Sequence, residues 1–278
     1  MTEFDCDTPV VMTLSSHDPS GSAGIQADIE TTASLGCHCT PIITAICAKD
    51  TRALLDMRPA ETGLLIEQAR AILEDMPVKA IKIGLIGSIE NVEAVHTILH
   101  DYPELPVVLD PVTAEFNHEV FNAPAVISAI QTLLLPKATI ATPDITEALE
   151  FAQQADTIDA CAQEILETGC AYVLISGTRR TSNDYESCLY SKGQAVKRYN
   201  WPRIPQISHG CGATLAASIA SYLAHGLRIE DAVEQGQQFT WNALASSRRL
   251  GMGKRIPNRM HWATSSNDNR GRRKSQAS

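Results

Sequence analysis

Short apolar runs of strand length alternate with helical patterns along most of the chain, and this alternation limits the fold more than any other feature. Short apolar runs bounded by glycine or proline are typical of buried strands, whereas apolar residues three or four apart indicate amphipathic helices. The predicted strands are residues 10–16, 41–48, 79–84, 106–110, 139–142 and 171–176. The predicted helices are residues 25–35, 59–74, 91–99, 145–153 and 157–167, with another around Ile127, Ile130 and Leu134. Strands that alternate with helices predict an α/β fold, with a mostly parallel sheet covered on both faces.

The last third of the chain departs from this alternation. Residues 185–199 alternate in polarity around Lys192 and Gly193, which predicts an antiparallel hairpin at the edge of the sheet. The segment 208–215 (SHGCGATL) places two glycines directly before an apolar helical run. Residues 229–247 are predicted to form the last helix.

Length, charge and cysteine content exclude several classes of protein. A length of 278 residues without an internal repeat or a long linker fits one α/β domain, expected to span residues 1–262. The polar, basic segment 263–278 is expected to be a disordered tail. The net charge of −9 argues against a nucleic-acid-binding surface. With no apolar stretch near ~18 residues and no basic leader, we expect a cytoplasmic protein and no membrane partner. The eight cysteines lack paired metal-ligand spacing and fit a reducing compartment.

The glycines within residues 208–215 predict a turn that opens onto a helix N-terminus. There the first backbone N–H groups have no partner inside the helix, and the helix dipole favours an anion such as phosphate. The alternative is an ordinary helix start, in which the glycines only permit a tight turn. A short glycine pattern does not by itself separate these two interpretations.

Polar residues lie at the ends of several predicted strands. Asp18, Lys49, Asp110 and Asp144 each follow or end a different strand. In open α/β sheets, ligands bind beyond the carboxyl ends of the strands. These four residues are therefore expected on one rim of the sheet, around a single cleft.

Several segments together resemble one known family. They are, in order, SSHDPSGSAGIQADIETTASLG, ITAICAKDT, IKIGLIGS, VVLDPV, LLPKATIATPDITEA and SHGCGATLAASIA. The chain resembles the hydroxymethylpyrimidine and phosphomethylpyrimidine kinases of thiamine biosynthesis from about Val11 to about His261. The resemblance implies a ribokinase-like fold, a three-layer α/β/α sandwich with a mostly parallel central sheet. It also implies a homodimer that uses Mg²⁺ and ATP to phosphorylate a hydroxymethyl group on a pyrimidine.

The resemblance also assigns residues to each part of the site. It places the transferred phosphate and the reacting hydroxyl near Gly210, Cys211, Gly212 and Ala213. The substrate-binding residues that it implies are Asp18, Gly21, Ala23, Gly24, Lys49, Leu85 and Val112. The implied ATP-binding residues are Asp110, Asp144, Ser176 and Gly177, and the implied Mg²⁺-orienting residues are Asp110, Asp144 and Glu147.

Asp144 and Glu147 stand where the family usually has an Asn-x-x-Glu motif. Carboxylate oxygens suit Mg²⁺, so aspartate in place of asparagine is tolerable. The alternative is a capping box, with Asp144 as the N-cap and Glu147 three residues later. The two roles are compatible with each other. A further family match, Gly251-Met252-Gly253 followed by Pro257, has a plain flexible turn as its alternative.

Three positions depart from the family pattern. Ala213 replaces the Cys or Asp that takes the proton from the attacking hydroxyl, and such a base is typically worth ~10²–10⁴-fold in rate. Ser176 replaces a lysine that neutralises phosphate charge. Lys49 replaces a Gln or Glu that contacts the pyrimidine edge. Because lysine only donates hydrogen bonds, Lys49 favours a ligand with an oxo or anionic group, unless it points to solvent.

Neighbouring residues offer alternatives for two of these lost groups. Arg179 or Arg180 could approach the phosphates in place of a lysine at Ser176, but both are also typical of an exposed loop. Cys211 could replace the base, although it lies two residues earlier than the family position. The same sequence thus supports a weak or inactive pyrimidine kinase, a non-catalytic pyrimidine- or nucleotide-binding sensor, or a vitamin B6 kinase.

Overall fold

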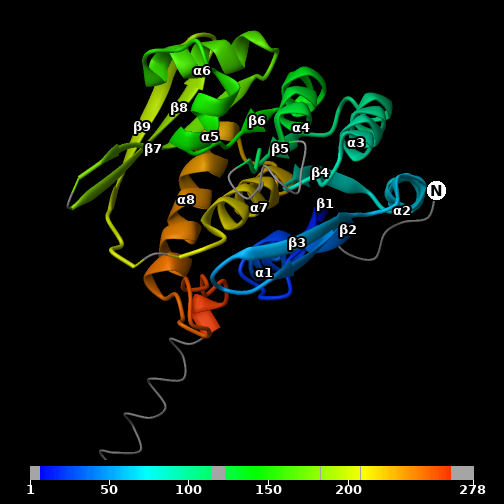
Figure 1. Cartoon of the computed structure of the whole chain (residues 1–278), viewed down its shortest axis with the longest axis horizontal. Helices are drawn as coiled ribbons and strands as arrows, with labels where there is room; N and C mark the ends of the chain where they lie inside the picture. Colours follow the sequence, from blue (N-terminus) through cyan, green and yellow to red (C-terminus); the bar gives the residue numbers. More distant parts are fainter. Residues whose placement is uncertain (1–6, 114–122, 182, 207, 264–278) are drawn as a thin grey trace, which may run out of the picture.

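The computed structural model describes residues 7–113, 123–181, 183–206 and 208–263. Within these residues one sheet of nine strands has the order β3-β2-β1-β4-β5-β6-β7-β8-β9 (Figure 1). Its strands are β1 (Val10–His17), β2 (His38–Lys49), β3 (Leu54–Pro59), β4 (Val78–Ile83), β5 (Val107–Leu109), β6 (Ile140–Ala141), β7 (Tyr172–Arg180), β8 (Asp184–Ser191) and β9 (Gln194–Pro202). The six neighbouring strands β2, β1, β4, β5, β6 and β7 pair in parallel. Strand β3 at one edge, and β8 and β9 at the other, pair antiparallel.

Helices connect these strands and cover both faces of the sheet (Figure 1). They are α1 (Gly24–Ser34), α2 (Thr62–Asp75), α3 (Ile89–Asp101), α4 (Ala123–Ala129), α5 (Ile145–Phe151), α6 (Ile158–Glu167), α7 (Cys211–Ala224) and α8 (Ile229–Ala245). A π-helical turn (Ile130–Leu134) and a 3₁₀ turn (Leu135–Lys137) continue α4. The predicted three-layer α/β/α architecture is therefore confirmed.

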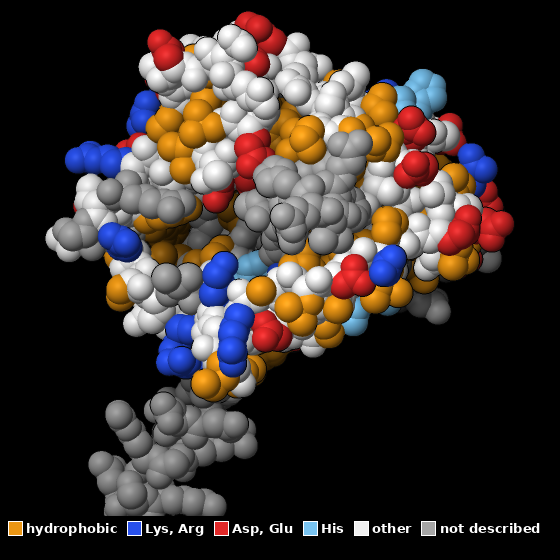
Figure 2. Space-filling model, in the orientation of Figure 1, with side chains coloured by type: hydrophobic (Ala, Val, Ile, Leu, Met, Phe, Trp, Pro, Cys, Tyr) orange, Lys and Arg blue, Asp and Glu red, His pale blue; other side chains and the backbone are white. Residues whose placement is uncertain are grey.

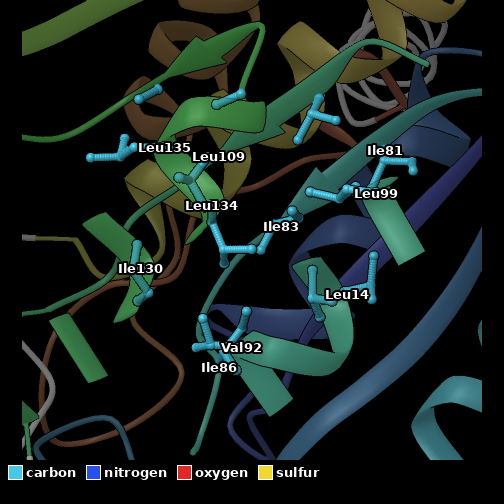
Figure 3. Close-up of a cluster of buried hydrophobic side chains, with 14 of the residues drawn as sticks. Leu14, Ile81, Ile83, Ile86, Val92, Leu99, Leu109, Ile130, Leu134 and Leu135 are labelled. Carbon is cyan, nitrogen blue, oxygen red and sulfur yellow. The ribbon is translucent and has the colours of Figure 1, made fainter. Parts of the chain in front are cut away.

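One face of the sheet packs against α2, α3, α4, α5 and α6. Leu14, Ile83 and Leu109, from three neighbouring strands, are buried there with Val92 of α3 and with Ile130 (Figure 3). Because successive side chains of a strand point to opposite faces, the neighbours of these residues along each strand point to the other face of the sheet. This apolar layer fixes the helices that lie behind the parallel strands.

The opposite face packs against α7 and α8, with α1 beside α7. Val11, Ala80 and Val108 alternate with the residues of the first layer and meet Ala216 and Ile219 of α7. Small residues along α7 allow it to be buried on almost every side and to lie close to the centre of the sheet. Its N-terminus is thereby fixed near the carboxyl ends of β4 and β5.

Several predicted boundaries were wrong. The helix predicted from residue 59 begins at Thr62, because Pro59 ends β3, a strand that the sequence did not reveal. Leu55 in β3 is 71% exposed, so this edge strand lacks the buried apolar pattern of the others. The strand predicted to end at Ser176 continues as β7 to Arg180, across an irregularity in its pairing with β8.

The predictions for the two ends of the chain have different outcomes. The tail predicted at 263–278 lies outside the described residues except for Ala263, so its disorder stays a prediction. Among the described residues, every helix is too short or too polar to cross a lipid bilayer.

Candidate active site

A cavity of ≈ 560 Å³ lies beyond the carboxyl ends of the parallel strands. Most of the site residues predicted from the sequence line it, which confirms that strand-end residues meet around one cleft. Gly21 and Gly177 are not among the lining residues. The predicted residues that line it are Asp18, Ala23, Gly24, Lys49, Leu85, Asp110, Val112, Asp144, Glu147, Ser176, Gly210, Cys211, Gly212 and Ala213.

Asp18 organises the loop that follows β1. Its Oδ1 accepts hydrogen bonds from the backbone N of Ser20 at 2.9 Å and from Ser20 Oγ at 2.7 Å. Its Oδ2 accepts from Ser22 Oγ at 2.7 Å and from the backbone N of Ala23 at 3.0 Å. Burial by itself raises the pKa of the Asp18 carboxyl, but these bonds and the Lys49 charge outweigh it, so the pKa lies below its usual value. Asp18 is therefore an ionised anchor for residues 18–24.

Glycine is required where this loop enters α1. Gly24 has φ +61°, and a Cβ at that position would lie 2.1 Å from the carbonyl oxygen of Ser16. Only a residue without a side chain allows the backbone to pass this close to the end of β1. The loop is thus held tightly against the strand that it follows.

Lys49 is the last residue of β2 rather than the first residue after it. Its Nζ lies 2.6 Å from Nε2 of His209 and 3.9 Å from Oδ2 of Asp18, and its side chain is only 6% exposed. A lysine ammonium has three donors and no acceptor, so Nε2 of His209 is the acceptor in this contact. Of the two alternatives for Lys49, the one in which it points to solvent is wrong, because its side chain is 6% exposed and lines the cavity.

The glycine turn before α7 meets two other parts of the site. Gly210 is the N-cap of α7 with φ +91°, and a Cβ there would lie 1.7 Å from the carbonyl oxygen of Ser22. A Cβ on Gly212 would lie 3.0 Å from Oδ1 of Asp110. The two glycines therefore bring the N-terminus of α7 against the loop at 18–24 and beside the Asp110 carboxylate. This geometry fits an N-terminus that holds a phosphate together with a cation.

Ala213 lies in the first turn of α7, is almost fully buried and lines the cavity. It has no group that can accept a proton. The thiol of Cys211 instead contacts the carbonyl oxygen of Ser208, with Sγ 3.7 Å away, and burial raises its pKa. A protonated thiol is a poor base, which argues against Cys211 as a replacement for the base.

Asp144 and Glu147 form the capping box that the sequence suggested. Oδ1 of Asp144 accepts from the backbone N of Thr146 at 2.7 Å and of Glu147 at 3.0 Å, while Oε2 of Glu147 accepts from the backbone N of Asp144 at 2.9 Å. Burial raises the pKa of Glu147 to about 8, and the nearby Asp110 carboxylate adds to the shift. Two buried carboxylates that oppose each other's ionisation would be relieved by a cation between them.

The donor set at this end of the cavity fits Mg²⁺. Among the described residues no three His, Cys, Asp or Glu side chains form a complete metal-binding cluster. Mg²⁺ is usually bound through one or two carboxylates, with waters and substrate phosphates completing its shell. Asp110, Glu147 and Oδ2 of Asp144 could supply these carboxylates, since both backbone bonds to the Asp144 side chain go to Oδ1.

Ser176 is buried and lines the cavity, with its backbone N donating to the carbonyl oxygen of Pro143 at 3.0 Å. The arginines that follow it belong to β7 and not to the loop that the sequence predicted. Arg179 is exposed, its backbone pairs in register with Glu186 of β8, and it is not among the lining residues. The serine hydroxyl is thus the side chain at the position where the resemblance implied a lysine.

Another part of the cavity wall comes from residues that the sequence did not single out. Trp201 of β9 donates from Nε1 to Oε1 of Gln237 in α8 at 3.2 Å, and Trp241 donates to the carbonyl oxygen of Pro202 at 2.9 Å. All four residues line the cavity. No pattern in the sequence pairs the edge hairpin with α8. The one available signal was the presence of a tryptophan in an otherwise polar part of each segment, which can indicate a binding surface.

The loop at residues 251–254 closes another side of the cavity. A Cβ on Gly253 would lie 2.1 Å from the carbonyl oxygen of Thr51, and Lys254 donates its backbone N to the same oxygen at 2.9 Å. The Gly-Met-Gly segment therefore packs closely against the turn that follows β2. Its neighbour Lys254 lines the cavity, and Figure 2 shows lysine and arginine side chains gathered over this part of the molecule.

Arg259 connects the loops of the site, although no motif in the sequence pointed to this residue. Its side chain is 0% exposed, and its guanidinium donates to Thr214 Oγ1 at 3.0 Å and to the carbonyl oxygens of Gly21 and Ser22. It also pairs with Glu30 Oε2 at 3.1 Å. Gly21, predicted to bind substrate, thus contributes through its carbonyl to the position of the loop.

Comparison with known proteins places this arrangement of loops in a family. Residues 18–258 match a family model described as phosphomethylpyrimidine kinase. The chain belongs to this family. The hydroxymethylpyrimidine/phosphomethylpyrimidine kinase of Mycobacterium tuberculosis is 31% identical over 251 residues, covering 88% of this chain and 91% of the relative. The Escherichia coli enzyme of the same name is 30% identical and covers 87% and 93%.

Solved structures of two kinds of vitamin kinase share the fold. Phosphomethylpyrimidine kinase from Clostridium difficile superposes with a TM-score of 0.72 at 28% identity, covering 85% of this chain and 100% of that one. Pyridoxal kinase from Staphylococcus aureus in complex with pyridoxal gives a TM-score of 0.81 at 26% identity, covering 92% and 95%. The predicted family and ribokinase-like fold are confirmed.

Proposed function

We propose that this protein is an ATP-dependent kinase for a hydroxymethyl group on a heteroaromatic ring, as the family name implies, and that its turnover is slow. The observation that carries the proposal is the meeting of Gly210, Gly212 and Asp110 at the N-terminus of α7, in the same cavity as Asp18 and Lys49. A phosphate held by the helix N-terminus then lies in the same cavity as the ring.

A related structure supports nucleotide binding. The Staphylococcus aureus pyridoxal kinase, with a TM-score of 0.80 at 25% identity, was solved with the ATP analogue AMP-PCP. In the protein described here, the cavity wall that holds Trp201 and Trp241 is aromatic and could pack against an adenine base. Mg²⁺ held by Asp110 and Glu147 would neutralise charge on the phosphate oxygens. Phosphoryl transfer depends mainly on such positioning and charge stabilisation.

Slow turnover follows from what the first turn of α7 lacks. Ala213 leaves the attacking hydroxyl without a general base, which is typically worth ~10²–10⁴-fold in rate. Ser176 supplies no charge to the phosphates. Because substrate positioning and the helix N-terminus remain, we expect turnover to be slow but measurable.

The test is an assay of the purified full chain with Mg-ATP and hydroxymethylpyrimidine, with the phosphorylated product identified by mass spectrometry. Product formed far more slowly than by a family member with Cys at the position of Ala213 supports the proposal. Turnover at the rate of that family member contradicts the role assigned to Ala213. Absence of product with any hydroxymethyl ring contradicts the kinase proposal.

A sensor that binds without catalysis is the second candidate, favoured by the loss of side-chain chemistry at Ala213 and Ser176 together. Calorimetric titration with hydroxymethylpyrimidine and, separately, with ATP distinguishes it from a slow enzyme. Binding of the ring in the absence of ATP, together with no product in the assay, supports the sensor. Saturable turnover contradicts it.

A further inference from the structure

Lys49 is held in the cavity by two side chains from distant parts of the chain. Its ammonium lies 2.6 Å from His209 Nε2, contributed by the loop before α7, and 3.9 Å from Asp18 Oδ2, contributed by the loop after β1. The lysine side chain is 6% exposed and the Asp18 side chain 2% exposed. The ammonium group of Lys49 is therefore held in one position inside the cavity, unlike that of a solvent-exposed lysine.

The groups around Nζ leave few acceptors for a ligand that donates hydrogen bonds. The two oxygens of Asp18 already accept four bonds from Ser20, Ser22 and Ala23. Nε2 of His209 accepts from Lys49 itself. An exocyclic amino group brought to this place would face a donor, and it would have to compete for acceptors that are already used. A buried donor without an acceptor weakens the binding of the ligand that carries it.

An oxygen acceptor at the same ring position meets the opposite situation. An oxo group or a phenolate oxygen accepts a hydrogen bond from the lysine ammonium, and charge assistance strengthens that bond. An amino ring therefore sets two donors against each other at Lys49, whereas an oxo or phenolate ring sets an acceptor against the lysine donor. Sites built this way discriminate more strongly than apolar pockets do.

We infer that Lys49 is the specificity-determining residue and that the site takes hydroxymethyl rings with an oxo or phenolate oxygen at the edge that meets Lys49, in preference to aminopyrimidines. This inference rests on the proposed function, since it names the substrate class for the same site. It makes the 4-oxopyrimidines and the 3-hydroxypyridines the favoured classes of ring.

Binding measured without nucleotide tests the inference separately from catalysis. Calorimetry on the full chain compares a 4-amino-5-hydroxymethylpyrimidine with its 4-oxo counterpart and with a hydroxymethylated 3-hydroxypyridine. The oxo ring or the hydroxypyridine is expected to bind at least about tenfold more tightly than the amino ring. Equal affinities, or tighter binding of the amino ring, would overturn the inference.

Variants at Lys49 show whether this residue causes the preference. Lys49→Gln, which can both donate and accept, is expected to reduce the preference at least about tenfold, whereas Lys49→Arg retains it. Lys254→Gln, which removes another lysine of the same cavity, leaves the ratio of affinities unchanged. A preference that survives in Lys49→Gln contradicts the inference. If the preference behaves as expected but no ring is phosphorylated, the proposed kinase function fails and the inference on binding stands.

Discussion

Nζ of Lys82 lies 2.9 Å from Oδ1 of Asp28, and both side chains are 0% exposed. The pair joins β4 to α1 at the cavity, which Lys82 lines. A Cβ on Gly84 would lie 2.6 Å from the same Nζ, so the strand end leaves space for this one ammonium group. The floor of the cavity thus depends on a buried ion pair.

Removing one partner of this pair is expected to destabilise the protein strongly. Lys82→Met leaves the Asp28 carboxylate buried and unpaired, which costs about 3–5 kcal/mol in the free energy of unfolding. The double variant Lys82→Met/Asp28→Leu recovers most of the loss, because no charge stays buried. Urea unfolding followed by circular dichroism measures both variants. A single variant that loses less than about 1 kcal/mol would contradict a structural role for the pair.

The two glycines at the ends of α7 are expected to differ in their tolerance of alanine. Gly210 and Gly226 both have positive φ, +91° and +84°, but a Cβ meets the Ser22 carbonyl only at Gly210. Gly226→Ala carries the left-handed strain alone, about 1–2 kcal/mol. Gly210→Ala also displaces the loop at 18–24, so its free energy of unfolding falls further, by at least about 2 kcal/mol more. Equal losses in urea unfolding would show that the close approach costs nothing.

Asp18 is expected to make stability depend on pH in acid. Its folded pKa lies below the usual 3.8, so an unfolded chain takes up this proton first as the pH falls. The contribution of the carboxylate is therefore complete above pH 3.8 and is lost as the pH falls through the folded pKa. Asp18→Asn should cost about 1–3 kcal/mol at pH 7. The gap between wild type and variant, measured by urea unfolding, should narrow below pH 3.8, and a constant gap would contradict this prediction.

Restoring a titratable group at Ala213 is expected to restore catalysis. Ala213→Cys places a thiol in the first turn of α7 and should raise turnover by ~10²–10⁴-fold if the base is the main loss. Ala213→Ser is the matched control, because a hydroxyl of similar size is a much weaker base. The assay with Mg-ATP and hydroxymethylpyrimidine measures all three proteins. A cysteine variant no faster than the serine control means that more of the site than the base has changed.

Local pattern and topology were enough to place much of the site. Asp18, Asp110 and Asp144 could be assigned to one rim because the ends of parallel strands point in the same direction, whatever the details of packing. The capping box of Asp144 and Glu147 followed from their spacing alone. These predictions succeeded because each depends on residues near in sequence or on the direction of a strand.

The rest depends on contacts between distant segments. His209 is 160 residues from Lys49, and nothing in either segment indicates the other. Trp201 and Gln237 meet only because the edge hairpin lies beside α8. Strand β3 was missed because its exposed residues lack the apolar run by which buried strands are recognised.

Arg259 has a consequence for the order in which the site is completed. The loop at 18–24 belongs to the start of the chain, yet the guanidinium that holds the Gly21 carbonyl is supplied 238 residues later. During synthesis the two cannot meet until nearly all of the described residues have left the ribosome. A nascent chain can build its parallel strands early, but the loop at 18–24 gains its buried anchor only at the end, so this side of the cavity is completed last.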